Sequence, residues 1–154
     1  MRQRWLPVGV LAGVLFAVNV VARLVSRFAL DADAAMQDRL SLAMFLVIGV
    51  VLGAVAFVWG QRRPVERWGG DVALAILVAL ALTVFVGPFL NGDHPFSNGA
   101  GAFFSQVWLY AGFSAAGVFL GYLVLIALGW DHRSQSLKRY AETKLSKPRR
   151  VVRR

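Results

Sequence analysis

The chain of 154 residues contains no cysteine. This absence excludes a disulfide framework, a thiolate metal site and a cysteine nucleophile. Charged residues are also scarce, at 16% of the chain, whereas 58% of the residues are hydrophobic. The charges gather at the two termini and in one loop, which leaves long uncharged stretches between them. This distribution is typical of an integral membrane protein rather than of a soluble domain.

The apolar centres of these stretches contain no Asp or Glu. A proton or cation pump usually needs a buried carboxylate, so this absence argues against such a pump. The two histidines, His94 and His132, fall on opposite membrane faces, so we expect no metal site and no other cofactor. No phosphate-binding Gly loop, metalloprotease motif or supported Ser-His-Asp arrangement is present. We therefore expect no enzymatic activity; a membrane enzyme would require Asp93 and His94 to converge with the aspartates around Asp31.

Four apolar runs are each long enough to cross the ~30 Å core of a bilayer, which takes roughly 20 helical residues. We expect spans at about 5–25, 40–60, 71–90 and 103–130, followed by a basic tail over 131–154. The fold class predicted is all-α, a polytopic membrane protein whose four helices form an up-down-up-down bundle over residues 1–130. A cleaved signal peptide is the alternative for the first run, but two arginines separate that run from the small-residue cleavage site.

Turn residues predict where the helices end. Pro64 and the pair Gly69–Gly70 make the segment 60–70 a turn, so Asp71 becomes the expected N-cap of the third span. Gly87–Pro88 lies near the far end of that span, where a kink is tolerated.

The basic residues predict the orientation. Three of the 17 Lys and Arg residues, namely Arg23, Arg27 and Arg39, fall on one side of the predicted spans, and all the others fall on the opposite side. Basic segments stay in the cytoplasm, so both termini are expected to be cytoplasmic and the protein to reside in the plasma membrane. Four tryptophans fall on that same inner side, where their amphipathic rings prefer to lie. They are Trp5, Trp59, Trp68 and Trp130.

Each span carries small residues at four-residue spacing, which lets helix backbones approach closely in lipid. One such pair is a weak signal, but a pair in every span favours a compact bundle. We expect these residues to pack within the chain; packing between two copies, as a homo-oligomer, is the alternative. They are Gly9 and Gly13, Gly49 and Gly53, Ala79 and Thr83, and Gly117 and Gly121.

A stripe of polar residues follows the outer end of the first span. Asn19, Arg23 and Arg27 recur at four-residue spacing and therefore share one helix face. Arg39 and His94 lie in the outer loops on the same side. Arginine binds phosphate well, so these five residues form a candidate site for an anion or a lipid headgroup. The simpler interpretation, which we favour from sequence, is that the arginines extend to the headgroups or pair with Asp31, Asp33 and Asp38. Asn19 then bonds another helix.

Two further patterns carry polar side chains. Gln106, Tyr110 and Ser114 share one face of the fourth span, where they bond neighbouring helices or, alternatively, line a path for a polar substrate. In the tail, helical spacing predicts an amphipathic helix on the inner leaflet that ends near Pro148, followed by a flexible cationic end. Six basic residues are candidates for contact with anionic lipids or a partner protein: Lys138, Arg139, Lys144, Lys147, Arg149 and Arg150.

These patterns predict a structural or accessory subunit that acts through its bundle surface and its basic tail, with the lipid bilayer and a membrane protein as partners. A small transporter or channel for an anion or a lipid headgroup, built on Arg23 and Arg27, is the alternative. No aromatic residues are interleaved with the basic residues of the tail, so we expect no nucleic acid as a partner.

Overall fold

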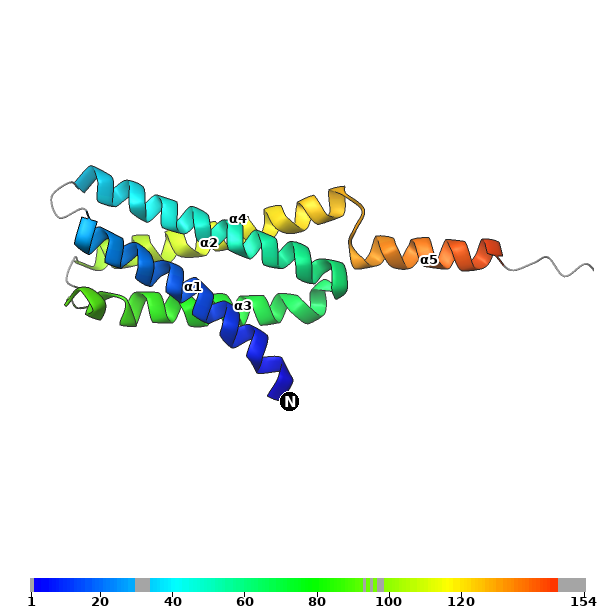
Figure 1. The fold of residues 1–154 in the computed structure, drawn as a ribbon, viewed down its shortest axis with the longest axis horizontal. Coiled ribbons are helices and arrows are strands. Elements are labelled where there is room, and N and C mark those ends of the chain that lie inside the picture. Colours follow the sequence, from blue (N-terminus) through cyan, green and yellow to red (C-terminus); the bar gives the residue numbers. More distant parts are fainter. Residues whose placement is uncertain (1, 30–33, 93, 95, 97–98, 147–154) are drawn as a thin grey trace, which may run out of the picture.

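The computed structural model describes residues 2–29, 34–92, 94, 96 and 99–146, and this part of the chain is all-helical. Five α-helices follow one another, and α3 continues into a short π-helix, η1, and then a 3-10 helix, η2 (Figure 1). Their bounds are α1 Arg2–Ala29, α2 Ala34–Arg62, α3 Val65–Ala81, η1 Leu82–Val86, η2 Pro88–Asn91, α4 Gly99–Ala127 and α5 His132–Ser146.

Four helical stretches of the described chain are long and apolar enough to cross a membrane. They are Trp5–Ser26, Asp38–Arg62, Val65–Val86 and Gly99–Leu145, of which the last continues past the end of α4 into α5. Four such stretches indicate a multi-pass membrane protein. The outward surfaces of these helices remain largely apolar, which suits lipid as their solvent.

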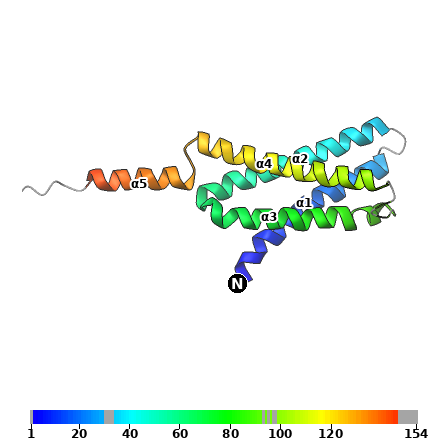
Figure 2. The same ribbon diagram turned by 180° about the vertical axis from the view of Figure 1, so that it is seen from behind.

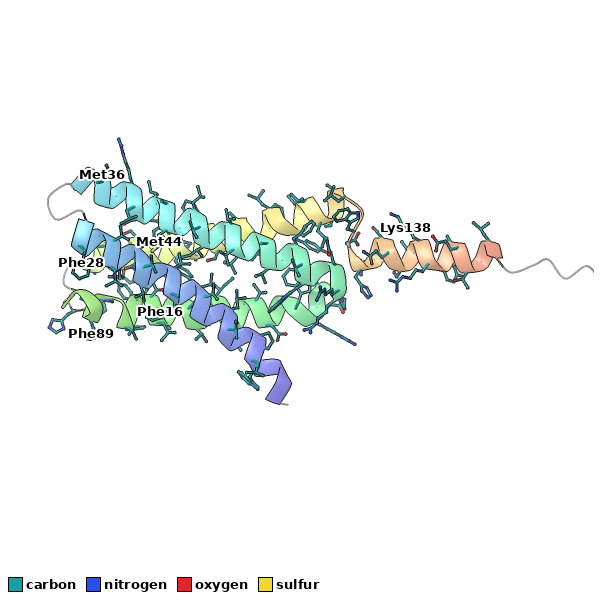
Figure 3. The ribbon with its side chains drawn as sticks, in the orientation of Figure 1. Phe16, Phe28, Met36, Met44, Phe89 and Lys138 are labelled. Atoms are coloured by element: carbon teal, nitrogen blue, oxygen red, sulfur yellow. The ribbon has the colours of Figure 1, made fainter. Side chains whose placement is uncertain are left out.

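The helices α1 to α4 pack into a bundle around one core (Figures 1 and 2). The most extensive contact joins α2 to α4, while α1 packs against α3 and α2. Each helix contributes a fully buried side chain, for example Leu15, Ile48, Ala75 and Tyr110. Figure 3 labels Phe28, Met36 and Phe89 at one end of the bundle, which is called the Phe28 end below; α5 lies beyond the opposite end.

Four glycines allow α2 and α4 to cross in backbone contact. A Cβ atom added to Gly117 would lie 2.6 Å from the Cα atom of Gly49, and one added to Gly121 would lie 2.6 Å from the Cα atom of Gly53. Carbon atoms do not approach so closely, so any larger residue would force the two helices apart. These four residues of the predicted small-residue pairs therefore act inside the chain.

The pair in the first span does not pack in this way. A Cβ atom added to Gly9 or Gly13 would meet no atom within 4 Å among the described residues. The helix α1 turns its opposite face to the core and buries Val8, Leu11 and Leu15 there instead. The expectation of packing within the chain is therefore wrong for Gly9 and Gly13. The third span differs again, because both Ala79 and Thr83 are fully buried.

The turn expected over residues 60–70 is much shorter than predicted. The helix α3 begins at Val65, with the extended backbone of Pro64 directly before it, so Asp71 lies inside the helix and is not its N-cap. Proline suits the start of a helix because it has no N–H group to leave unpaired. Two glycines inside a helix cost about 1 kcal/mol each relative to alanine. Burial of Trp68, which is 2% exposed and packs 6.0 Å from the Tyr122 ring, offsets that cost.

The far end of the third span changes its helical pitch, as the Gly87–Pro88 pair predicts. The N–H group of Gly87 donates to the carbonyl of Leu82 at 3.0 Å, which closes the wide turn of η1. Pro88 then starts η2, because a proline ring cannot continue the regular hydrogen-bond ladder. A π-turn of this kind is frequently found at functional sites, and Gly87, which follows this one, lies against the side chain of Arg23.

Candidate functional site

Asn19 and Arg23 meet in the half of the bundle near the Phe28 end. Asn19 is 1% exposed; its Nδ2 atom donates to the sulfur of Met44 at 3.1 Å, and its Oδ1 atom accepts a hydrogen bond of 2.9 Å from Nε of Arg23. One turn of α1 separates the two residues, so they share a face. Both groups of the buried amide are satisfied, and the amide holds the half-buried Arg23 guanidinium against the bundle.

Gly87 makes room for that guanidinium. A Cβ atom added to Gly87 would lie 2.9 Å from Nε and 3.1 Å from Cζ of Arg23. The backbone at the junction of η1 and η2 therefore forms one wall around the arginine head. A side chain at this position would clash with the carbonyl oxygen of Thr83 as well as with the arginine head, so glycine is the residue that fits here.

A pocket of about 370 Å³ opens beside Arg23 between α1, α2 and α4; it is called the Arg23 pocket below. Its described lining contains one basic residue, Arg23, and one acidic residue, Asp38. The other polar side chains in the lining are Asn19, Ser26, Ser41, Ser105 and Gln106. A guanidinium, a carboxylate and several hydroxyl and amide groups in one pocket suit a ligand that carries charge and hydrogen-bonding oxygen atoms.

Hydroxyl groups continue from this pocket into the core. Tyr110 and Ser114 follow Gln106 on the same face of α4, and Thr83 lies in η1. All three hydroxyls are buried without a hydrogen-bond partner among the described residues. A buried hydroxyl without a partner is unfavourable by about 1–3 kcal/mol, so each of these three groups destabilises the core as it stands.

The structure brings together residues that the sequence placed in separate candidate sites. Asn19 and Arg23 from the arginine stripe and Gln106 from the polar face of the fourth span all line the Arg23 pocket. The backbone of Arg27 lies in α1, but its side chain is outside the described part of the chain. Arg39 is exposed and does not line the pocket, and exposed His94 rests edge-on against Phe89 at 6.1 Å.

Several pocket residues are not among the candidate site residues that the sequence indicated. Asp38 and Ser41 lie one turn apart at the start of α2, and Ser26 lies one turn beyond Arg23. Their spacing of three residues was the available signal, since such pairs share a helix face. Among the described residues, no group of three or more His, Cys, Asp or Glu side chains lies close enough to hold a metal ion.

Two helix caps lie at the opposite end of the bundle, one at the end of α4 and one at the start of α5. Gly129, at φ +64°, ends α4, and the N–H of Trp130 returns to the carbonyl of Leu125 at 3.2 Å. Asp131 then begins α5 by accepting a hydrogen bond of 3.2 Å from the N–H of Ser134. Hydrogen bonding by Ser134, its side chain foremost, holds the pKa of the Asp131 carboxyl below its ordinary value.

The helix α5 extends away from the bundle roughly along its long axis (Figures 1 and 2). Lys138, Arg139 and Lys144 are exposed along it, and Figure 3 labels Lys138 beyond the bundle. The ammonium group of Lys144 lies 5.7 Å from the centre of the Tyr140 ring. The other three tail candidates, Lys147, Arg149 and Arg150, lie outside the described residues.

No protein-family model, curated protein or solved structure matches this chain. The class of the protein therefore follows from its own helices and pocket. It is a multi-pass helical membrane protein with a polar pocket, partly charged, near one end of its bundle.

Proposed function

We propose that this protein binds a phosphate-bearing lipid headgroup, or a small anion of the same chemistry, in the Arg23 pocket. The observation that carries the proposal is the hydrogen bond from Arg23 to the buried Asn19. An arginine that serves only to anchor a helix end extends its head into the headgroup region. Here Asn19 and the backbone at Gly87 fix the guanidinium at the wall of a pocket.

The proposal includes an orientation in the plasma membrane. The four spans alternate in direction, both termini are cytoplasmic, and the Phe28 end faces outward. The excess of Lys and Arg at the termini and in the segment around Arg62 and Arg67 supports this orientation. The Arg23 pocket then lies at the level of the lipid phosphate groups of the outer leaflet.

Binding of lipid to a single variant tests this function. Arg23→Gln keeps a hydrogen-bond donor at the position of Nε, near Asn19, but shortens the side chain and removes its charge. A hydrogen bond to a charged group contributes about 1.5–3 kcal/mol, so we expect a loss of affinity of at least about tenfold. Native mass spectrometry of protein released from lipid nanodiscs measures the phospholipid retained per chain.

Arg39→Gln is the matched control, because Arg39 is exposed on the same side and does not line the pocket. It should retain phospholipid as the unaltered protein does. Retention that is equal in Arg23→Gln, Arg39→Gln and the unaltered chain would remove the proposed function.

A second candidate function is that of an accessory subunit that contacts a membrane-protein partner through α5. Its support is the exposure of Leu137, Tyr140 and Leu145 on a helix that extends away from the bundle. If α5 instead lay on the inner leaflet, these three residues would be buried in lipid and would not be open to a protein partner. Crosslinking in intact membranes from a photoreactive residue at Leu145 tests this candidate: a crosslink to one protein supports it, and crosslinks to lipid alone would contradict it.

A further inference from the structure

We propose that the occupant of the Arg23 pocket is one zwitterionic glycerophospholipid of the outer leaflet. Its phosphate lies at Arg23, its ammonium group lies at Asp38, and one of its acyl chains lies in a groove between α1 and α2. This inference rests on the proposed function and goes beyond it, because it names the class of ligand and the place of its apolar part.

The groove is a separate feature that opens on the surface formed by α1 and α2. It has a volume of about 480 Å³, and the ten lining residues that the structure describes are all apolar. Valine and alanine side chains form most of it, including Val14, Val21 and Ala17 on α1 and Ala43 and Val47 on α2. A groove with this lining, open on the lipid side of two membrane helices, admits a hydrocarbon chain and offers nothing to a polar ligand.

The groove and the Arg23 pocket adjoin each other. Ala22, Leu40 and Met44 line both of them. Met44 also accepts the hydrogen bond from Asn19, so the wall between the polar and the apolar part is formed by residues of both. An amphiphile is the class of molecule that presents a charged head and an apolar chain at such a junction.

The length of the groove fits one leaflet. Along α1 the lining residues run from Val25 to Val14, a rise of ~16 Å at ~1.5 Å per residue. This is about half of the ~30 Å hydrocarbon core of a bilayer. The groove therefore leads from the level of the Arg23 pocket to the middle of the membrane, which is the depth that an acyl chain of an outer-leaflet lipid occupies.

The charges of the pocket select the headgroup. Arg23 and Asp38 are the charged residues of its described lining, and their formal charges cancel. A headgroup that carries a phosphate but no ammonium group would bring no opposite charge to Asp38. A headgroup that carries both a phosphate and an ammonium group matches the two side chains, because each charge meets its opposite.

The experiment compares two ligands with the same acyl chains, phosphatidylethanolamine and phosphatidylglycerol, in nanodiscs that contain the two lipids in equal amounts. Native mass spectrometry measures how much of each the chain retains. A third probe, the soluble headgroup glycerophosphoethanolamine, is added to detergent-solubilised protein and has no acyl chain. The unaltered protein should retain phosphatidylethanolamine at least severalfold better than phosphatidylglycerol.

The groove is tested by Ala43→Phe, which places a ring among the lining residues. It should lower retention of phosphatidylethanolamine about tenfold or more and leave binding of the soluble headgroup unchanged. Ala54→Phe, also exposed on α2 but outside the groove, is the matched control and should change neither. Ala17→Phe repeats the test from α1 and serves if Ala43→Phe does not fold.

The headgroup is tested by Asp38→Asn, which should reduce or reverse the preference for phosphatidylethanolamine over phosphatidylglycerol. Unchanged retention in both groove variants, with retention lost in Arg23→Gln, would overturn this inference and leave the proposed function standing. A preference of the unaltered protein for phosphatidylglycerol would overturn the zwitterionic ligand. Unchanged retention in Arg23→Gln would remove the inference and the proposed function together.

Discussion

Nε of Arg23 donates a hydrogen bond of 2.9 Å to Oδ1 of Asn19, which itself is anchored by its bond to the sulfur of Met44. The three residues form a chain from the core of the bundle to the Arg23 pocket. Because Asn19 is buried, its amide cannot turn to water for a replacement partner. Asn19 therefore sets the position of the guanidinium, and it does not need to touch the ligand to do so.

Asn19→Leu should lower lipid retention by about tenfold although it leaves Arg23 in place. The change removes the acceptor that orients the guanidinium, and leucine has the same branching and the same number of side-chain heavy atoms. Asn19 and Arg23 should behave as one unit. The loss of lipid retention in the double variant, which carries both Asn19→Leu and Arg23→Gln, should therefore be much smaller than the sum of the losses in the two single variants. Additive losses in this double-mutant cycle would show that Asn19 has no part in positioning Arg23.

Gly117→Ala should destabilise the bundle, because the added methyl group meets the backbone of Gly49. Overpacking of this kind typically costs about 1–3 kcal/mol, and a lower midpoint of thermal unfolding in detergent would record it. The control is Gly112→Ala on the same helix, where an added Cβ atom meets nothing within 4 Å. Alanine is a better helix former than glycine by about 1 kcal/mol, so the control should be neutral or stabilising. Equal effects of the two changes would contradict the close crossing of α2 and α4.

Tyr110→Phe and Ser114→Ala should each stabilise the protein or leave its stability unchanged. The hydroxyls they remove are buried and have no hydrogen-bond partner among the described residues. Removing such a group relieves a desolvation penalty of about 1–3 kcal/mol. The midpoint of thermal unfolding of the lipid-free protein in detergent measures the effect. A loss of more than about 1 kcal/mol in either variant would mean that the hydroxyl is bonded in the membrane.

Asp131→Ala should loosen α5 at its first turn and speed proteolysis there, since loss of an N-cap costs about 0.5–2 kcal/mol. The pKa of Asp131 is lowered in the folded protein, so the cap stabilises α5 above the ordinary pKa of an aspartate, about 3.9. That stability is lost as the pH falls through the lowered pKa that Asp131 has in the folded protein. Asp131→Asn keeps a capping oxygen without the charge, so its α5 should resist a protease equally at pH 7 and near pH 3. A protection of the unaltered α5 that does not change with pH would contradict the charged cap.

The hydropathy of the sequence was sufficient to find the spans, because apolar runs of this length are rarely anything other than membrane-spanning helices. It did not reveal the Arg23 pocket, because that depends on how each helix is rotated about its own axis. Asn19 and Arg23 share a face by spacing alone, but whether that face meets Asp38 and Gln106 is decided by packing. The Gly117 and Gly49 contact, which sets the separation of α2 and α4, is a tertiary effect of the same kind.

Two expectations failed for local reasons. The Gly69–Gly70 pair suggested a break, yet burial of Trp68 holds that segment in α3. Small residues at Gly9 and Gly13 suggested packing within the chain, yet larger apolar residues on the other face of α1 reach the core. In both cases burial of a large side chain outweighs the preference of the small residues beside it.

The proposed lipid site requires the Phe28 end to lie outside the cell, because the Arg23 pocket otherwise faces the wrong leaflet. The chain has no cysteine, so single cysteines can be introduced without background. Intact cells carrying His94→Cys or Glu142→Cys, both at exposed positions, are treated with a membrane-impermeant maleimide. Labelling of His94→Cys, with Glu142→Cys labelled only after the cells are opened, is the predicted result. Labelling of Glu142→Cys on intact cells, with His94→Cys protected, would contradict the account.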